Sequence, residues 1–256
     1  MLGLGYSYIT QSKNRKPISL AFSNTQSVSL DGVDDYVTVP DDDTLDVTSN
    51  FTASIWVYLG NMDEAEQDLA GVLFEKESIY VFFNRPNTLS QVWKLKAKLE
   101  GASGNGFLES DQITEVGSDA WANFVVSYKK EGAGSDELRI YQNGSEIKSV
   151  TNLTIGDLDN DTGTLQLGRY RTSANVYFFG KLDEFALWNE TLDADAISAV
   201  YNSGVPFDLT EDKGNYDEYT DGLVCYLRFE GDFNDSSGNG NNASAGNQAS
   251  IATAAP

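Results

Sequence analysis

The stretch FTASIWVY, residues 51–58, indicates the fold class, because its side chains alternate in character. The odd-numbered positions are apolar and share one face of an extended chain: Phe51, Ala53, Ile55 and Val57. The even-numbered positions share the other face: Thr52, Ser54, Trp56 and Tyr58. This period of two predicts a β-strand with its apolar face packed against a second layer.

Similar short runs recur through most of the chain, and turn-forming residues separate them. The runs lie at residues 28–30, 36–39, 71–75, 78–83, 92–99, 121–128, 137–142, 164–168 and 181–188. Asn143-Gly144 directly follows one run and predicts a two-residue hairpin turn, and the glycine-rich stretch 101–106 is also interpreted as a turn. Many short strands with almost no helix between them predict an all-β fold, an antiparallel sandwich or barrel.

One segment has helical spacing instead. Residues 191–204 offer Thr191 or Asp193 as an N-cap, and Gly204 followed by Pro206 ends the pattern. A polar, acidic connector then leads to a further strand at 222–230, to a loop of turn-forming residues at 235–244, and to an Ala/Ser tail. Because a lone strand is unstable in water, residues 222–230 must pair with the main sandwich or with another subunit.

The chain is therefore divided into three parts. Residues 1–26 form an N-terminal arm that carries a small basic group at Lys13, Arg15 and Lys16. This arm is either a flexible leader or a segment that docks on an acidic partner surface. Residues 27–206 form the β-sandwich, and residues 207–256 complete it or pair with a neighbour.

Length and composition describe a folded protein with an unusual charge. The chain has 256 residues, of which 40% are apolar and 22% charged, enough for one large domain or two small ones. Its 17 basic and 39 acidic residues give a net charge of −22, without any histidine. That field repels phosphate backbones and argues against nucleic-acid binding. The missing histidine excludes Ser-His-Asp and Cys-His catalysis, and the single Cys225 excludes an intrachain disulfide.

No run of apolar residues reaches the length of a membrane span. The first ten residues lack a basic leader ahead of an apolar stretch, so they are not interpreted as a secretory signal. We therefore expect synthesis in a cytosol, with a working place that can still lie outside the cell.

Five motifs in one order carry a family resemblance. They are LDGVDDYV at 30–37, FTASIWV at 51–57, Trp121 opening a strand, LRIY with Asn143-Gly144 at 138–144, and GKLDEFALWN at 180–189. They resemble the laminin-G-like, pentraxin-like branch of the concanavalin A-like jelly rolls, over residues 27–204. The loop at 235–242, with the strand before it, looks like the segment that usually opens such a domain, and its place after the domain also looks like lectin-fold structural proteins of tailed-phage virions. Ala122 and Asn123 stand where family members often carry two histidines.

Clustered carboxylates favour a hard cation such as Ca²⁺. Asp31, Asp34 and Asp35 share one tight turn, and the resemblance implies that this turn and Asp183 hold a structural ion together. The alternative is that these aspartates only bond turn amides. Asp235, Asn239 and Asn241 are a weaker candidate, with a plain Asx-Gly turn as the alternative. The acidic run 41–43 is interpreted as a solvated loop.

Two kinds of carbohydrate chemistry, cleavage and binding without cleavage, make different demands on the sequence. A retaining glycosidase needs two carboxylates about 5–5.5 Å apart. Around Asp183 and Glu184 neither strand face carries a pair, and Glu75 with Glu77 lies at the end of a strand, so we expect no enzyme. Sugar binding without cleavage would use aromatic faces, and Trp93, Tyr170 and Tyr177 fall beside loops, whereas Trp56, Trp121 and Trp188 are expected in the core.

The sequence thus favours a non-enzymatic virion structural protein, made in the host cytoplasm and displayed outside it. Its expected partners are other virion proteins or copies of itself, contacted through residues 1–26 and 222–244, and host glycans. The alternative is a secreted or surface-bound lectin or adhesin module.

Overall fold

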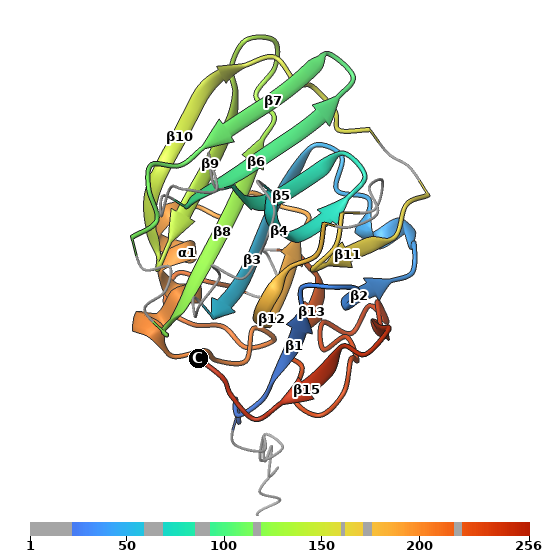
Figure 1. The fold of residues 1–256 in the computed structure, drawn as a ribbon. Helices are drawn as coiled ribbons and strands as arrows, with labels where there is room; N and C mark the ends of the chain where they lie inside the picture. The colour runs from blue at the N-terminus through green and yellow to red at the C-terminus, as the bar shows by residue number, and fades with distance from the viewer. Residues whose placement is uncertain are drawn as a thin grey trace, which may run out of the picture.

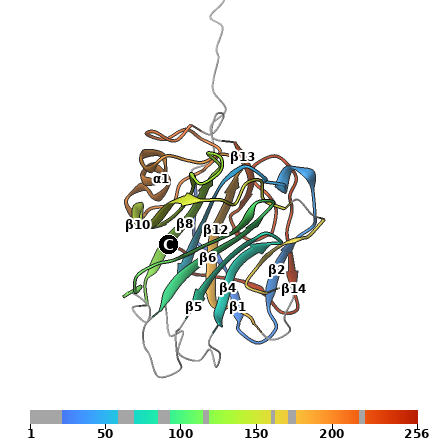
Figure 2. The same cartoon turned by 90° about the horizontal axis from the view of Figure 1, so that it is seen from above.

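The computed structural model describes residues 22–58, 69–84, 93–114, 119–159, 162–170, 176–217 and 222–256. These residues form two antiparallel sheets packed face to face (Figures 1 and 2). Sheet A has eight strands in the order β10-β9-β8-β3-β12-β1-β15, with β13 also paired to β12. Sheet B has seven in the order β14-β2-β11-β4-β5-β6-β7. The expected sandwich of the concanavalin A-like type is confirmed.

The bounds of the elements are as follows. The strands are β1 (Ser27–Asp31), β2 (Tyr36–Val39), β3 (Asn50–Tyr58), β4 (Leu69–Lys76), β5 (Ile79–Asn84), β6 (Lys94–Gly101), β7 (Gly104–Glu109), β8 (Trp121–Lys129), β9 (Asp136–Gln142), β10 (Ser145–Leu153), β11 (Leu165–Leu167), β12 (Phe179–Trp188), β13 (Leu223–Leu227), β14 (Ser244–Gly246) and β15 (Ser250–Ala252). The helical elements are the 3₁₀ turns η1 (Asp43–Leu45) and η2 (Asn202–Gly204) and the helix α1 (Ala194–Tyr201).

The core lies between the sheets, and β3 shows how the sequence pattern produces it. The four apolar odd-numbered residues of 51–58 point into this core, as the alternation predicts. The opposite face of β3 is covered as well. Trp56 stacks on Tyr201 at the end of α1, with ring centroids 5.7 Å apart.

A second apolar cluster holds α1 against the outer face of sheet A. It joins Ile197 and Val200 of the helix to Trp188 of β12 and Tyr226 of β13. The helix begins where Asp193 accepts a hydrogen bond from the Ala196 amide at 2.8 Å, so Asp193 is the N-cap of the two candidates. The helix predicted at 191–204 is confirmed in a shorter form.

Strand β7 differs from the sequence prediction, which placed a turn across 101–106. The turn is limited to Ala102 and Ser103, and the chain is already in a strand from Gly104. The glycines are needed for packing here. A Cβ on Gly106 would lie 2.2 Å from the Ile155 side chain, so only glycine lets the two segments approach.

The C-terminal part of the chain contributes to both sheets. β13 pairs with the Phe185–Trp188 half of β12, β14 adds to β2, and β15 adds to β1. Residues 222–252 therefore complete the sandwich of their own chain, and the segment interpreted as an Ala/Ser tail supplies two strands. Within the described ranges, no helix has the length and apolar character needed to cross a bilayer.

Candidate functional site

The outer face of sheet B combines lysines with aromatic rings. Strand β6 reads Lys-Leu-Lys-Ala-Lys-Leu from residue 94, and its apolar residues point into the core. Its lysines therefore face outward. In the strand register, Lys98 lies between Phe107 of β7 and Tyr80 of β5. We call this surface the cationic–aromatic face, made of Lys94, Lys96, Lys98, Phe107, Tyr80, Phe82 and Tyr170.

A hollow of about 140 Å³ opens on this face. Six residues line it: Val72, Tyr80, Phe82, Lys98, Tyr170 and Val176. The rings of Tyr80 and Tyr170 lie 5.7 Å apart and are tilted by 55°, and the Lys98 ammonium lies 5.1 Å from the centre of the Tyr80 ring. The walls are therefore apolar and aromatic, and Lys98 contributes a positive charge.

The lysines are held in place by carboxylates beside them. Glu109 Oε1 binds Lys94 Nζ at 2.6 Å, and Glu109 Oε2 binds Lys96 Nζ at 2.7 Å. These hydrogen bonds, from Lys94 first and then Lys96, lower the pKa of Glu109. Lys96 also lies over the ring of Phe107 at 5.2 Å, and Phe107 is 52% exposed. Lys98 pairs with Glu100.

On the side of Tyr80 that faces away from Lys98, the strand register leads to buried polar side chains. Glu75 of β4 lies opposite Tyr80 and Gln166 of β11, and both Glu75 and Gln166 are buried. Glu77 lies beyond the end of β4 in a turn, with φ of 37°. Glu75 and Glu77 therefore do not share one strand face.

The aromatic residues singled out from the sequence lie in different places. Tyr170 lines the hollow, and the guanidinium of Arg169 lies 6.0 Å from the ring centre of Tyr177. Trp93 is buried in the core, so it offers no stacking face. Trp188 is buried as expected, but Trp121 is only partly buried and packs edge-on against Tyr58.

The aspartate turn after β1 has the geometry of an Asx turn. Asp31 Oδ1 accepts hydrogen bonds from the amides of Val33 and Asp34, at 2.8 and 3.2 Å. Asp35 Oδ1 accepts from the Gln248 amide at 2.9 Å. The carboxylates of Asp31, Asp34 and Asp35 also offer oxygens within 4.8 Å of one another. The turn alone accounts for the Asp31 contacts, and an ion there stays a prediction.

Asp183 lies away from this turn. In the pairing of β1 with β12, Asp31 lies opposite Phe179 and Val28 lies opposite Leu182. One residue further along each strand, Asp183 comes next to Ser27. Four residue steps separate the two places, about 13 Å along the strand. The expectation that Asp183 and the turn share one ion is therefore wrong, because strand register holds them at opposite ends of β1.

Asp183 instead lies in a group of buried oxygen atoms. It is fully buried, and neither of its carboxylate oxygens has a hydrogen bond of full geometry to the described residues, although the Glu184 amide and the Asn24 side chain both approach the carboxylate. The same holds for Ser27 Oγ and for both polar atoms of the Asn24 side chain, which lies beside Asp183. Burial raises the pKa of Asp183, and the charge of Glu184 raises it further. A hard cation would satisfy such oxygens.

The N-terminal segment 22–26 covers this group. Glu230 accepts hydrogen bonds from the amides of Thr25 and Gln26, each at 2.7 Å. Arg228 lies over the ring of Phe22 at 4.3 Å and donates to the carbonyl of Ser23. The last residues of the predicted arm are thus attached to their own domain. Lys13, Arg15 and Lys16 lie outside the described residues.

Glu184, the neighbour of Asp183, points to the same outer face because the strand bulges here. Its φ is 48°, and the pairing of β12 with β3 shifts between Asp183 and Ala186. Burial raises the pKa of Glu184 to about 8. The hydroxyl of Tyr226 donates to Glu184 Oε2, and Arg228 Nε lies 3.6 Å from Oε1.

The weaker candidate loop is fully engaged in structural hydrogen bonds. Asp235 Oδ1 accepts from the amides of Tyr226 and Ser237, at 2.8 and 2.9 Å, and Oδ2 accepts from the Asn241 amide at 2.9 Å. The side chains of Asn239 and Asn241 donate to backbone carbonyls of β13. This pattern fits the Asx-Gly turn, the alternative to a metal site.

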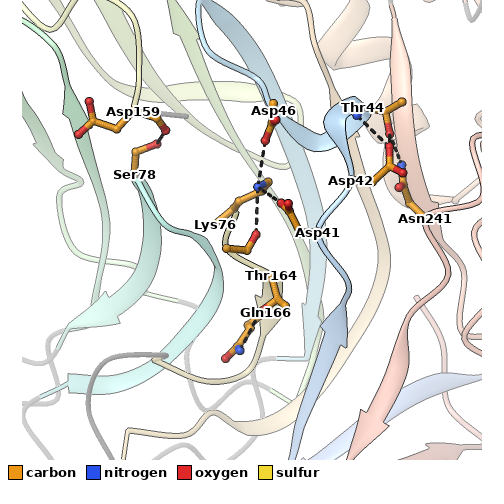
Figure 3. Close-up of polar contacts among 11 residues, drawn as sticks. Asp41, Asp42, Thr44, Asp46, Lys76, Ser78, Asp159, Thr164, Gln166 and Asn241 are labelled. Carbon is orange, nitrogen blue, oxygen red and sulfur yellow. Dashed lines mark hydrogen bonds and ion pairs between the residues drawn. The ribbon is translucent and has the colours of Figure 1, made fainter. Parts of the chain in front are cut away.

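The acidic run 41–43 is more structured than a solvated loop (Figure 3). Lys76, 8% exposed, reaches from β4 to Asp41 and Asp46 at 3.2 Å each, and donates to the carbonyl of Gly163 at 3.0 Å. Asp42 caps η1 by accepting from the Thr44 amide at 2.9 Å. This network ties β4 to the segment that follows β2 and to the residues that precede β11.

Comparisons with known proteins agree with this architecture. A protein of Bacteroides ovatus provisionally described as carbohydrate-binding superposes with a TM-score of 0.60 at 16% identity, over 91% of this chain and 61% of its own. A heptameric SAP-like pentraxin from Limulus polyphemus gives 0.50 at 14% identity, over 87% and 95%. The binding domain of botulinum neurotoxin serotype D gives 0.51 at 14% identity, over 70% and 43%. At these identities the likeness shows the fold.

No curated protein matches the chain significantly. The family model of the concanavalin A-like lectin/glucanases superfamily matches residues 31–198, more than half of the 256-residue chain. That interval contains strands of both sheets and every residue of the cationic–aromatic face. The chain therefore belongs to the concanavalin A-like lectin/glucanases superfamily.

Proposed function

We propose that this chain is a carbohydrate-binding module whose ligand lies on the cationic–aromatic face. The hollow between Tyr80, Phe82 and Tyr170 carries the proposal. The C–H face of a sugar ring packs on aromatic walls, and polar groups at the rim fix its hydroxyls. Here Lys98 supplies such a group. The provisional description of the Bacteroides ovatus neighbour, which shares the fold, supports the same assignment.

A glycan array tests the proposal. We expect the wild-type chain to bind a defined set of glycans and Tyr170→Ala to bind them at least tenfold more weakly, because the variant removes one aromatic wall. The matched control is Tyr58→Ala, which removes a ring from the outer face of sheet A. A flat array for the wild type, or equal losses in both variants, would contradict this function.

We further propose that the face binds without cleaving. Glycoside hydrolysis needs two carboxylates across the scissile bond, and in the described hollow the charged lining residue is Lys98. Bound oligosaccharides should therefore keep their length. Appearance of new reducing ends during incubation would refute this part of the proposal.

A structural Ca²⁺ is also proposed, with Asp183, Asn24 and Ser27 as the residues that would hold it. These side chains offer the hard oxygen donors that Ca²⁺ prefers, and the contacts that the Asn24 side chain and the Glu184 amide make to Asp183 fall short of full hydrogen-bond geometry. The ion would fix segment 22–26 to β12. The turn at Asp31, Asp34 and Asp35 stays a second predicted site.

The finer proposal concerns location: we propose that the module is displayed on a virion. The sequence resemblance supports it, together with the attachment of residues 22–26, which fixes where the preceding basic segment leaves the domain. Because β13 and its loop bond within their own chain, residues 1–26 are the better candidate for contacts with virion partners. Immunogold labelling of particles from a host lysate tests this. Unlabelled particles with free antigen in the medium would favour a secreted lectin instead.

A further inference from the structure

We infer that the ligand of the cationic–aromatic face is an acidic oligosaccharide, one whose sugar rings carry carboxylate or sulfate groups. This inference rests on the proposed carbohydrate-binding function and names its ligand class. It follows from where the chain places its few positive charges.

Positive charge is scarce in this chain, and three of its 17 basic residues stand in one row on this face. Acidic residues outnumber basic ones by 39 to 17, so most of the surface repels an anion. On β6, however, three successive outward positions are lysines, Lys94, Lys96 and Lys98. Lys94 and Lys96 share the carboxylate of Glu109, and Lys98 pairs with Glu100, so three lysines meet two carboxylates and one positive charge is left over. One lysine is enough to bond the hydroxyls of a neutral sugar, whereas a row of three favours a ligand that carries negative charge.

The lysines are also oriented for recognition. Lys96 lies over Phe107 and Lys98 over Tyr80, at 5.2 and 5.1 Å from the ring centres. Packing of each stem on a ring restricts the ammonium group before any ligand arrives. Phe107 is the exposed ring of the two and Tyr80 is buried, so a sugar unit can pack on Phe107 or on the partly exposed Tyr170 while its acidic group meets a neighbouring lysine.

The dimensions suit a short chain rather than a single sugar. From β7 to β4 the face crosses three strand intervals, about 14 Å at the usual spacing. Phe107, which is 52% exposed, forms one stacking position at the edge, and the hollow at Tyr80 and Tyr170 forms another. A ligand that spans both passes over Lys96 and Lys98.

The test compares matched acidic and neutral probes by isothermal titration. The probes are oligogalacturonate, its methyl ester, heparin oligosaccharides, and neutral cello- and galacto-oligosaccharides. We expect binding to an acidic probe, weakening as NaCl rises from 50 to 500 mM, and at least tenfold loss in Lys98→Gln. Lys98→Arg should keep most of the affinity. The control is Lys181→Gln, since Lys181 lies 4.9 Å over the Tyr58 ring on the opposite sheet.

The outcomes separate the two proposals. If neutral probes bind, Tyr170→Ala abolishes their binding and Lys98→Gln does not change it, the acidic ligand class is wrong and the carbohydrate-binding function stands. If no probe and no array glycan binds, the function itself fails. If Lys181→Gln weakens acidic binding as much as Lys98→Gln, the charge acts over the whole surface and the assignment to this face is overturned.

Discussion

Asp136, at the start of β9, gives the sharpest test of the structure. It is 1% exposed, and its carboxylate holds two loops together. Oδ1 accepts hydrogen bonds from the amides of Glu131 and Gly132, each at 3.0 Å. Oδ2 accepts from the amides of Ile155 and Gly156, each at 2.9 Å. An Asp136→Asn variant keeps one acceptor oxygen and turns an amide NH₂ toward the other pair of N–H groups.

The magnitude follows from these four contacts. Two backbone N–H groups lose their acceptor, at a cost of about 1–3 kcal/mol each, so we expect Asp136→Asn to lower the free energy of unfolding by about 2–6 kcal/mol at pH 7. Burial acts to raise the pKa of Asp136, but hydrogen bonds from Gly156, Ile155 and the other two amides outweigh it and lower the pKa to about 2.

The pH dependence provides an independent check. Because the folded pKa lies below the unfolded value near 3.9, the ionised carboxylate contributes about 2.5 kcal/mol of stability. That contribution is present above pH 4 and is lost as the pH falls through 2. The difference between wild type and Asp136→Asn should therefore shrink between pH 4 and pH 2.

Urea denaturation followed by tryptophan fluorescence measures both quantities. The control is Asp111→Asn, whose carboxylate is 86% exposed and pairs with Lys148 at 3.1 Å, and which should change stability by less than about 1 kcal/mol. Equal stability of wild type and Asp136→Asn at pH 7, or a difference that does not change with pH, would refute the reasoning.

Three further predictions concern the ion site, the buried lysine and the N-terminal attachment. Adding Ca²⁺ at 100 times its dissociation constant to protein freed of metal by a chelator should raise Tm by about 5–10 °C. Asp183→Asn should abolish this shift. A wild-type Tm that does not change with Ca²⁺ would contradict the proposed ion. Lys76→Met should lower the free energy of unfolding by about 2–4 kcal/mol, because the carboxylates of Asp41 and Asp46 lose a nearly buried partner. The control Lys130→Met, at a partly exposed lysine, should cost less than about 1 kcal/mol. Similar losses for both variants in urea titrations would contradict the ion-pair account. Glu230→Gln should speed proteolytic cleavage near residues 22–26. The Glu230 carboxylate accepts three hydrogen bonds, two from Thr25 and one from the Gln26 amide, and these weaken when the group becomes neutral. Cleavage at an unchanged rate, followed on gels, would refute the attachment.

The sequence predicts strand type well, because alternation is local. The period of two at 51–58 identifies which side chains point inward, and this assignment agrees with the structure. The cap of α1 is local as well, and Asp193 was one of two candidates. Gly104 and Gly106 lie in β7 and not in the predicted turn, because a Cβ on Gly104 would lie 2.9 Å from the Thr154 carbonyl and one on Gly106 would meet the Ile155 side chain, contacts that come from a loop distant in the sequence.

The candidate sites were harder to predict, because they depend on register between distant strands. The alternating lysines of β6 were visible in the sequence, but their position between Phe107 and Tyr80 comes from sheet order. The motif around Asp183 was visible too. Its pairing beside Ser27, and not beside the aspartate turn, depends on how β1 meets β12.

The placement of β15 has a consequence for biosynthesis. β1 lies between β12 and β15, so it gains its second hydrogen-bonded neighbour only from residues 250–252. During translation the first strand therefore keeps one edge open until residues 250–252 have left the ribosome. Such long-range closure is slow and leaves an unpaired edge available to other nascent chains.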